Sequence, residues 1–157
     1  MKLQGLTPIL NVRDVVASRR WFADLGFERG FAWNGGGMLA PGLDENAHGP
    51  AHFGSVCSGD FEIFLCRDGQ GARDTHSWQG SIEEGGERRR AGEDDTGCVW
   101  MSWWLASPAE VDALHARAVE LGCEIAHPPV DEPWGVREFH LRHPDGHTFR
   151  VSAALRR

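Results

Sequence analysis

The sequence has no apolar run long enough to cross a membrane, and it has fewer basic than acidic residues. The longest apolar stretches, such as Val99 to Ala106, are far shorter than the roughly 20 residues that a membrane helix needs. Residues Met1 to Gly5 lack the apolar core of a signal peptide, so we expect a cytoplasmic protein. Lys and Arg number 16 against 23 Asp and Glu, which works against binding to nucleic acid and favours neutral or cationic partners.

Cysteine is scarce and tyrosine is absent. The four cysteines, at positions 57, 66, 98 and 123, include no C-x-x-C pair, so neither a zinc knuckle nor a disulfide framework is expected. Seven Trp and eight Phe are present instead, and four of the tryptophans lie between Trp78 and Trp104, which a core alone need not require. With 41% hydrophobic and 25% charged residues among 157, the composition is that of a globular protein.

The first half of the chain predicts a strand, a helix and three further strands. Asp14 stands where an N-cap precedes the apolar spacing of a helix, and Gly26 is a natural residue to end it. Ser58-Gly59-Asp60 is typical of a hairpin turn. The predicted elements are a strand over 6–12, a helix over 15–25, strands over 27–33, 51–57 and 61–66, a turn over 34–37 and a loop over 38–50.

The second half repeats this order. Ser107, Pro108 and Glu110 fit the N-cap, N1 and N3 positions of a capping box, and Gly122 ends the helix as Gly26 does. The predicted elements are a strand over 98–105, a helix over 108–121 and strands over 123–126, 136–142 and 148–153. We therefore predict a first βαβββ module over 1–66, a charged Gly-rich linker or lid over 67–97, and a second module over 98–157. The two modules pair within one chain or between two.

Two modules with one helix each predict an α+β fold, in which curved mixed sheets surround a cavity and the helices lie on the outer faces. Strand alternation separates two sets of side chains. Those predicted to face the helices are Leu10, Val12, Met101, Trp103, Leu105, Phe139, Leu141, Phe149 and Val151. Those predicted to face the cavity are Thr7, Ile9, Asn11, Trp100, Ser102, Trp104, Glu138, His140, Thr148, Arg150 and Ser152.

The repeat also carries short motifs: VRD at 12–14, LGF at 25–27, PWGVREF at 133–139 and HPDGH at 143–147. With them the sequence resembles the glyoxalase/bleomycin-resistance/dioxygenase superfamily, also called the vicinal oxygen chelate fold, over both modules but not over 67–97. The P-W-G-x-R-E-F…P-D-G pattern resembles the bleomycin-resistance branch. The resemblance implies a drug-binding protein and a homodimer that builds its pockets from both chains.

Enzymes of this superfamily hold a divalent metal on the first and fourth strands of each module. The resemblance assigns these positions to Thr7, Phe64, Trp100 and Arg150. None belongs to the usual imidazole and carboxylate ligand set, and Arg150 would bring a fixed positive charge to the place of the cation. We therefore expect no metal, no cofactor and no metal-dependent glyoxalase or dioxygenase chemistry.

The candidate ligand-binding residues combine aromatic rings with a few polar groups, a lining that suits a flat or polycyclic small molecule. They are Asn11, Phe64, Trp100, Ser102, Trp104, Trp134, Glu138, His140 and Arg150. In the alternative interpretation, Trp100 and Trp104 are core residues of a closed sheet pair. Glu138 is then half of a structural ion pair, and its partner is Arg150 because Arg137 lies on the opposite strand face. Trp134 precedes a glycine in a loop and needs cover from a ligand or a second subunit.

Other reactive side chains have weaker patterns. His140, His143 and His147 have a metal-like spacing, but a strand leads into a turn there, so we expect their side chains to diverge. His140 alone remains a candidate hydrogen-bond donor or acid/base group. Cys57 and Cys66 have no base beside them in the sequence pattern and are not expected to be nucleophiles.

Three functions fit these observations. The leading prediction is a metal-independent protein that confers resistance by sequestering an antibiotic or toxic metabolite. The expected partner is a hydrophobic or aromatic small molecule, and the net charge of −7 fits a cationic one. The alternative is a lyase- or isomerase-type enzyme of the same fold with Glu138 or His140 as general base and without the usual metal. The third is a module that serves only as an interaction domain. No nucleic-acid or membrane partner is expected.

Overall fold

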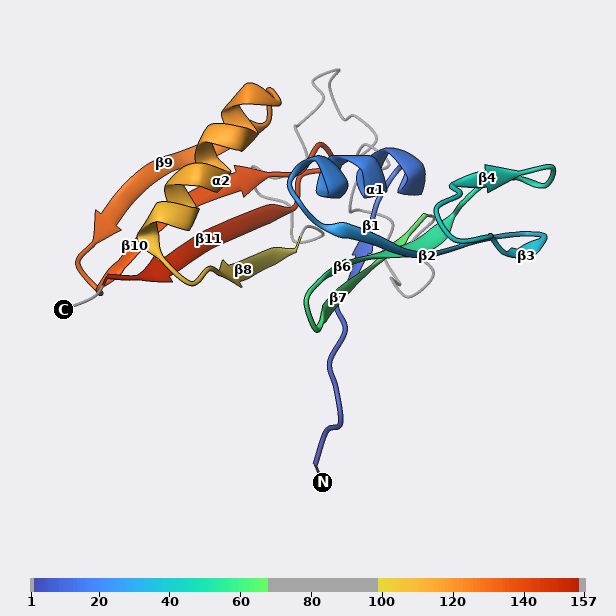
Figure 1. Cartoon of the computed structure of the whole chain (residues 1–157), viewed down its shortest axis with the longest axis horizontal. Helices are drawn as coiled ribbons and strands as arrows, with labels where there is room; N and C mark the ends of the chain where they lie inside the picture. Colours follow the sequence, from blue (N-terminus) through green and yellow to red (C-terminus); the bar gives the residue numbers. More distant parts are fainter. Residues whose placement is uncertain (1, 68–98, 156–157) are drawn as a thin grey trace, which may run out of the picture. The chain divides into compact units, whose positions relative to one another are not determined.

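The computed structural model describes residues 2–67 and 99–155. The chain divides into two compact units, residues 1–73 (unit 1) and residues 74–157 (unit 2). In Figure 1 each unit has one helix over a mixed sheet, and the α+β fold class predicted from the sequence is confirmed. The predicted linker or lid over 67–97 lies outside the described residues, apart from Arg67.

Unit 1 is built on a five-stranded sheet with the order β1-β7-β6-β2-β3, in which β1 and β7 are parallel and the other neighbours antiparallel. Its elements are β1 (Ile9–Asn11), α1 (Val15–Asp24), β2 (Glu28–Asn34), β3 (Gly37–Met38), β4 (Glu45–Asn46), β5 (Gly49–Pro50), β6 (Phe53–Ser58) and β7 (Phe61–Cys66). The segment 38–50, predicted as a loop, contains the separate β4–β5 hairpin.

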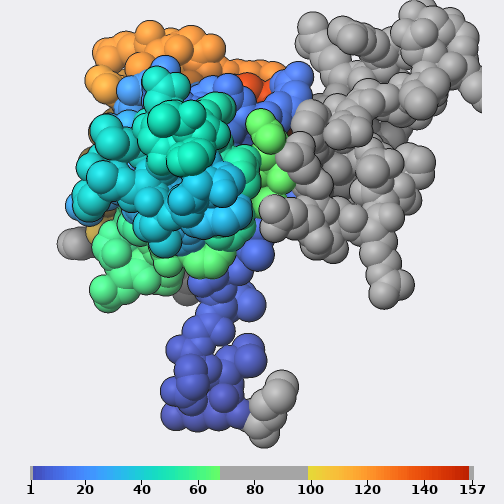
Figure 2. Space-filling view, turned by 90° about the vertical axis from the view of Figure 1, so that its right-hand side faces the viewer, coloured from blue at the N-terminus to red at the C-terminus, as the bar shows by residue number. Residues whose placement is uncertain are grey.

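Strand β1 is shorter than predicted. Residues 2–7 are exposed, and Figure 2 shows them extending away from the rest of unit 1. Pairing with β7 starts at Pro8, whose carbonyl accepts a hydrogen bond from the Phe64 N–H at 2.9 Å. Proline has no N–H of its own to continue the ladder, which accounts for the strand beginning at this point.

Helix α1 begins and ends where the sequence predicts. The Asp14 carboxylate accepts a hydrogen bond from the Ala17 backbone N–H at 2.9 Å, which makes Asp14 the N-cap. Gly26 follows the helix with a φ of 102°, in the left-handed region that glycine adopts without strain. The helix packs on a core of fully buried apolar side chains: Leu10, Val12, Val15, Phe22, Val56 and Leu65.

Arg19 is a buried cation at the edge of this core, which the sequence analysis did not predict. Its side chain is 1% exposed and pairs with Asp44, whose carboxylate also pairs with Arg29 at 2.7 Å. The guanidinium donates to the carbonyl oxygens of Gly30 at 2.7 Å and Ser55 at 3.3 Å. Burial lowers the pKa of Arg19, and Asp44 opposes that shift. Helix α1, the sheet and the segment before β4 are thus joined through one buried charge.

Unit 2 repeats the plan with a four-stranded sheet in the order β8-β11-β10-β9, in which β8 and β11 are parallel. Its elements are β8 (Trp100–Trp104), α2 (Pro108–Glu120), β9 (Glu124–Glu132), β10 (Val136–Arg142) and β11 (Thr148–Ala154). Strand β9 is nine residues long, whereas the sequence predicts a strand over 123–126 alone. It continues through Pro128 and Pro129 because it is the edge strand, where a missing N–H is tolerated.

Helix α2 has the predicted caps. The Ser107 hydroxyl accepts from the Glu110 N–H at 3.3 Å, and the Glu110 carboxylate accepts from the Ala106 N–H at 2.9 Å. Gly122 follows the helix with a φ of 70°. Neither helix is of a length and apolar character that would let it span a membrane, a finding that covers the described residues only.

The alternation predicted for the helix-facing side chains is confirmed where the strands are central. The fully buried members of that set are Leu10, Val12, Phe139, Leu141, Phe149 and Val151. Met101, Trp103 and Leu105, on the edge strand β8 or just after it, are half-buried. The opposite face of each sheet is therefore formed by the alternate residues.

Candidate functional site

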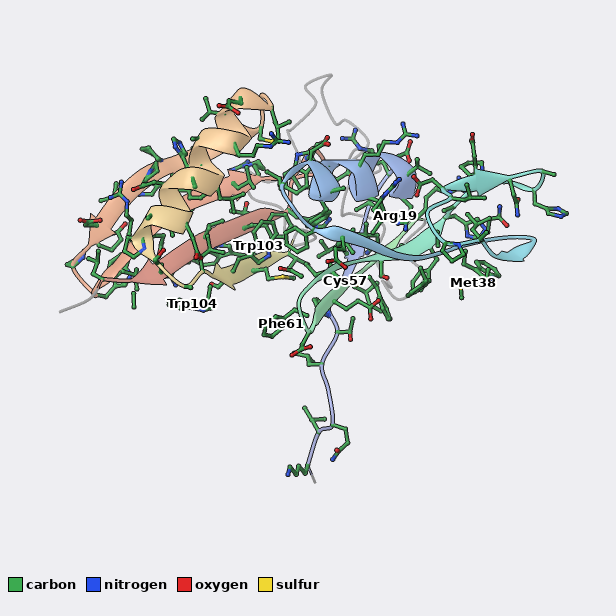
Figure 3. The ribbon with its side chains drawn as sticks, viewed as in Figure 1. Arg19, Met38, Cys57, Phe61, Trp103 and Trp104 are labelled. Carbon is green, nitrogen blue, oxygen red and sulfur yellow. The ribbon has the colours of Figure 1, made fainter. Side chains whose placement is uncertain are left out.

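The face of the unit 2 sheet opposite α2, called the open face below, carries most of the side chains predicted to bind a ligand. Trp103 stacks on Phe149 on the helix side with ring centroids 4.3 Å apart, and Figure 3 shows Trp104 pointing to the other side of β8. The register forms three rows across β8, β11 and β10: Trp100, Thr148 and Arg142; Ser102, Arg150 and His140; Trp104, Ser152 and Glu138.

Two exposed indole rings flank the middle row on β8. Trp100 is 70% exposed and Trp104 is 62% exposed. They belong to the rows on either side of Arg150, and adjacent rows on one sheet face are close enough for long side chains to meet. Unit 2 by itself therefore presents a guanidinium between two large rings.

Glu138 is the centre of the polar part of the open face. Its side chain is 4% exposed and its carboxylate accepts hydrogen bonds from His140 Nε2 at 3.0 Å, from Ser152 Oγ at 3.1 Å and from Arg150 Nε. The ion pair with Arg150 is the one that strand alternation predicts. A buried carboxylate with three donors is held in one orientation.

These contacts set the protonation of Glu138. Burial raises the pKa of the carboxyl, but the hydrogen bonds from His140, Arg150 and Ser152, together with the charge of Arg150, outweigh it and hold the pKa below its usual value. Because an ionised carboxylate only accepts hydrogen bonds, His140 must carry its proton on Nε2. Glu138 is thus a stabilised anion, poorly suited to take a proton from a substrate near neutral pH.

His127 extends the middle row onto β9 and was missed by the sequence analysis. Its ring lies 5.2 Å from that of His140, and its Nε2 is 3.6 Å from Glu132 Oε1. Trp100 meets His140 from the other side with a centroid distance of 6.2 Å. Alternation along β9 would have placed His127 on the open face, but the predicted strand ended one residue before it.

In unit 1 the face of the sheet away from α1 carries a cluster of three phenylalanines. Phe64, one of the predicted ligand-binding residues, packs edge-on against Phe31 at 5.3 Å and against Phe53 at 5.5 Å. Asn11, another predicted site residue, is half-buried and pairs in register with Cys66. Phe31 and Phe53 were not among the predicted ligand-binding residues. Alternation along their strands is the signal that would have placed them on this face.

Trp134 and two of the histidines lie elsewhere. Trp134 is 62% exposed in the turn between β9 and β10. His143 and His147 are buried in the turn between β10 and β11, where their Nδ1 atoms accept hydrogen bonds from Asp145 N and Val99 N. Their rings are 5.7 Å apart, so the prediction that the three histidines diverge is wrong for this pair. His140 points instead into the open-face network.

The cysteines of unit 1 have the surroundings of unreactive thiols. Burial and the nearby Glu62 carboxylate raise the pKa of Cys57, whose Sγ lies 3.8 Å from Glu62 Oε1. Cys66 is 3% exposed. A protonated or buried thiol is a poor nucleophile, which is consistent with the sequence prediction for both residues.

The residues at the metal positions implied by the resemblance do not fit a divalent cation. Phe64 belongs to an aromatic cluster, Arg150 carries a positive charge and no lone pair, and Trp100 offers no lone pair for a metal. Thr7 supplies only an exposed hydroxyl before β1. Over residues 2–67 and 99–155, no group of three or more His, Cys, Asp or Glu side chains is placed to hold a metal ion.

Two units, each with one helix over a mixed sheet, define the fold class as α+β. The chain belongs to the Glyoxalase/Bleomycin resistance protein/Dioxygenase superfamily, whose family model matches residues 5–151. The family resemblance predicted from the sequence is confirmed. Among curated proteins no sequence matches this chain.

Solved structures with the same fold are distant in sequence. TioX from Micromonospora sp. ML1 has a TM-score of 0.63 and 20% identity, over 97% of this chain and 99% of that one. A glyoxalase/bleomycin resistance protein/dioxygenase from Nocardioides has a TM-score of 0.61 and 22% identity, over 99% and 85%. Lactoylglutathione lyase from Agrobacterium tumefaciens has a TM-score of 0.61 and 16% identity, over 98% and 96%. At these identities the likeness concerns the fold alone.

Proposed function

We propose that this protein is a metal-independent binder of an aromatic small molecule, and that it confers resistance by sequestering an antibiotic or toxic metabolite in the cytoplasm. The observation that carries the proposal is the open face of unit 2. There, Trp100 and Trp104 expose most of their surface beside an ordered polar network centred on Glu138. Exposed tryptophans gathered beside fixed polar groups are typical of a surface that binds a flat ligand.

The state of Glu138 favours binding over catalysis. A general base needs a pKa near the working pH, whereas three donors keep this carboxylate ionised and its pKa below the usual value. The lyase- or isomerase-type alternative would then depend on His140, whose Nε2 is occupied by Glu138. The same network is well suited to holding a ligand, because its polar atoms are fixed before the ligand arrives.

We further propose that the protein acts as a homodimer, as the resemblance implies. Apart from the two tryptophans assigned to the ligand, large apolar side chains are exposed in both units: Ile9, Met38 and Phe61 in unit 1, and Trp134 in unit 2. Pairing of modules, within a chain or between two chains, would cover such side chains. Light scattering after size exclusion should give twice the mass of 17.4 kDa, and a monomer mass would contradict this part of the proposal.

The binding proposal is tested by tryptophan fluorescence while aromatic antibiotics and planar aromatic compounds are titrated into metal-free protein. We expect saturable quenching by at least one compound, lost in Trp104→Ala and retained in Trp21→Phe, a control on α1. Isothermal calorimetry with the same compound should show one binding event and no continuing heat. The proposal fails if quenching requires an added divalent metal, or if a compound is turned over at a rate that Glu138→Gln abolishes.

A further inference from the structure

The guanidinium of Arg150 is only partly used by the protein. Its Nε donates to Glu138, and the side chain keeps 24% of its surface exposed. Among the described residues no hydrogen bond joins either Nη atom to another group. A guanidinium carries five N–H donors in a fixed plane, so the four on the two Nη atoms remain for a ligand.

The network leaves no carboxylate open to a ligand. Glu138 is 3% exposed and already has three donors, so a ligand cation has no carboxylate to approach there. Ser102, the neighbour of Arg150 on β8, is exposed and adds a hydroxyl to the same row. The charged group of the middle row that a ligand can reach is therefore the Arg150 guanidinium, which is a hydrogen-bond donor.

Aromatic surface lies on both sides of these donors. Trp100 and Trp104 lie on β8, one row to either side of Arg150 on β11, and are 70% and 62% exposed. A planar ligand can rest on an indole ring while a group at its edge reaches the guanidinium. Two oxygens of a carboxylate match the spacing of two Nη donors, which gives a bidentate contact.

We infer that the ligand is an aromatic carboxylate, held by the Nη atoms of Arg150 with its ring against Trp100 or Trp104. This inference rests on the proposed function and names the ligand class for the same site. The expected charge is opposite to that of the cationic compound suggested by the net charge of −7. Contact with the Arg150 guanidinium should set the charge of the ligand, because salt screens a direct charge–charge contact less than it screens distant surface charges.

The test uses three probes with the same ring system and different edge groups: 2-naphthoate, 2-naphthamide and 2-naphthylmethylamine. Dissociation constants are measured by tryptophan quenching for wild type, Arg150→Lys and Arg137→Gln. Lysine keeps a cation beside Glu138 but lacks the planar fork. Arg137 is the matched control, because it lies on the opposite face of β10, where it pairs with Asp112 and Asp131.

We expect wild type to bind the naphthoate at least tenfold more tightly than the amide or the amine. Arg150→Lys should lose about tenfold in affinity for the naphthoate alone, and Arg137→Gln should leave all three affinities unchanged. Equal or tighter binding of the amine, or an unchanged naphthoate affinity in Arg150→Lys, would overturn the inference while leaving the binding proposal intact. Absence of quenching by all three probes would count against the binding proposal itself and so against both.

Discussion

Glu138 and Arg150 form their ion pair diagonally across two strands. Glu138 stands opposite Ser152 and Arg150 stands opposite His140, so each charged side chain reaches one row toward the other. Both register partners also donate to the Glu138 carboxylate, at 3.1 Å from Ser152 and 3.0 Å from His140. One buried anion thereby fixes three side chains of the open face, and its removal would leave three donors without their acceptor.

The first prediction concerns the stability that this anion confers. Glu138→Gln keeps the shape of the side chain but replaces the charge-assisted hydrogen bonds by weaker ones, and an amide nitrogen would face a donor. We expect a loss of about 2 kcal/mol in the free energy of unfolding at pH 7, measured by urea denaturation followed by circular dichroism. A loss below about 0.5 kcal/mol would show that the network orders the face without stabilising the fold.

The stability lost in Glu138→Gln should depend on pH. The pKa of Glu138 in the folded protein lies below its unfolded value of about 4.5, so its contribution to stability is present above that value. The contribution is lost as the pH falls through the folded pKa. The difference in stability between wild type and Glu138→Gln should therefore narrow as the pH is lowered from 7 to 3. A difference that stays constant over this range would contradict the lowered pKa.

Arg19 gives a prediction on buried charge. Arg19→Met leaves the Asp44 carboxylate with only Arg29 and removes a donor from the Gly30 and Ser55 carbonyls, so we expect a loss of about 3–5 kcal/mol in unfolding free energy. The control is Arg29→Met, which removes a cation from the same carboxylate at a side chain that is 37% exposed. It should cost about 1 kcal/mol or less. Equal losses in the two variants would refute a special role for the buried partner.

Local signals predicted both helices and the β6–β7 hairpin. The caps at Asp14 and Ser107 and the left-handed glycines after both helices act over a few residues, so the sequence contains all that determines them. The pairing of Glu138 with Arg150 was also predictable, because alternation along the two predicted strands assigns both residues to one face and Arg137 to the other.

Features that depend on distant parts of the chain were not predictable. The buried Arg19 finds its partner 25 residues away, in a segment whose short hairpin has no strong sequence pattern. The extension of β9 through two prolines depends on its place at the sheet edge, which becomes known only once the whole sheet is assembled. His127 was missed for the same reason.

Close packing of two strands in unit 1 gives a further prediction. A Cβ added at Gly30 would lie 2.2 Å from Ser55 Oγ and 3.2 Å from Cys57 Sγ. Gly30→Ala should therefore destabilise unit 1 by about 1–3 kcal/mol through overpacking. The double variant Gly30→Ala/Ser55→Ala should be more stable than the single Gly30→Ala variant, because the colliding hydroxyl is gone.

Gly54→Ala is the matched control for that rescue. A Cβ there would meet the backbone carbonyl oxygen of Phe31 at 2.9 Å, which no side-chain substitution can remove. Adding Ser55→Ala to Gly54→Ala should therefore restore nothing. Both double variants are compared with their single variants by urea midpoint, and a failure of the Gly30 rescue would mean that the strand backbones, and not the hydroxyl, limit the space.

Asn34 ties the β2–β3 turn to the β4–β5 hairpin through a fully buried amide. Its Nδ2 donates to Asn46 Oδ1 at 2.8 Å and to the Gly49 carbonyl at 2.7 Å, while its Oδ1 accepts from the Gly36 N–H at 3.0 Å. Asn34→Asp would place an ionised carboxylate against two acceptors. We expect it to lose about 3 kcal/mol or more at pH 7, and to lose more than Asn34→Ala.

The two Asn34 variants should also differ in their response to pH. The folded-state pKa of the new aspartate is expected above its unfolded value, because burial and the facing oxygens disfavour the anion. Its penalty should therefore shrink as the pH falls from 7 to 4, when the protonated carboxyl can donate one of the two lost hydrogen bonds. The penalty of Asn34→Ala, measured against wild type at each pH, should stay constant. If Asn34→Asp and Asn34→Ala lose the same stability at both pH values, the two Nδ2 hydrogen bonds do not hold the hairpin.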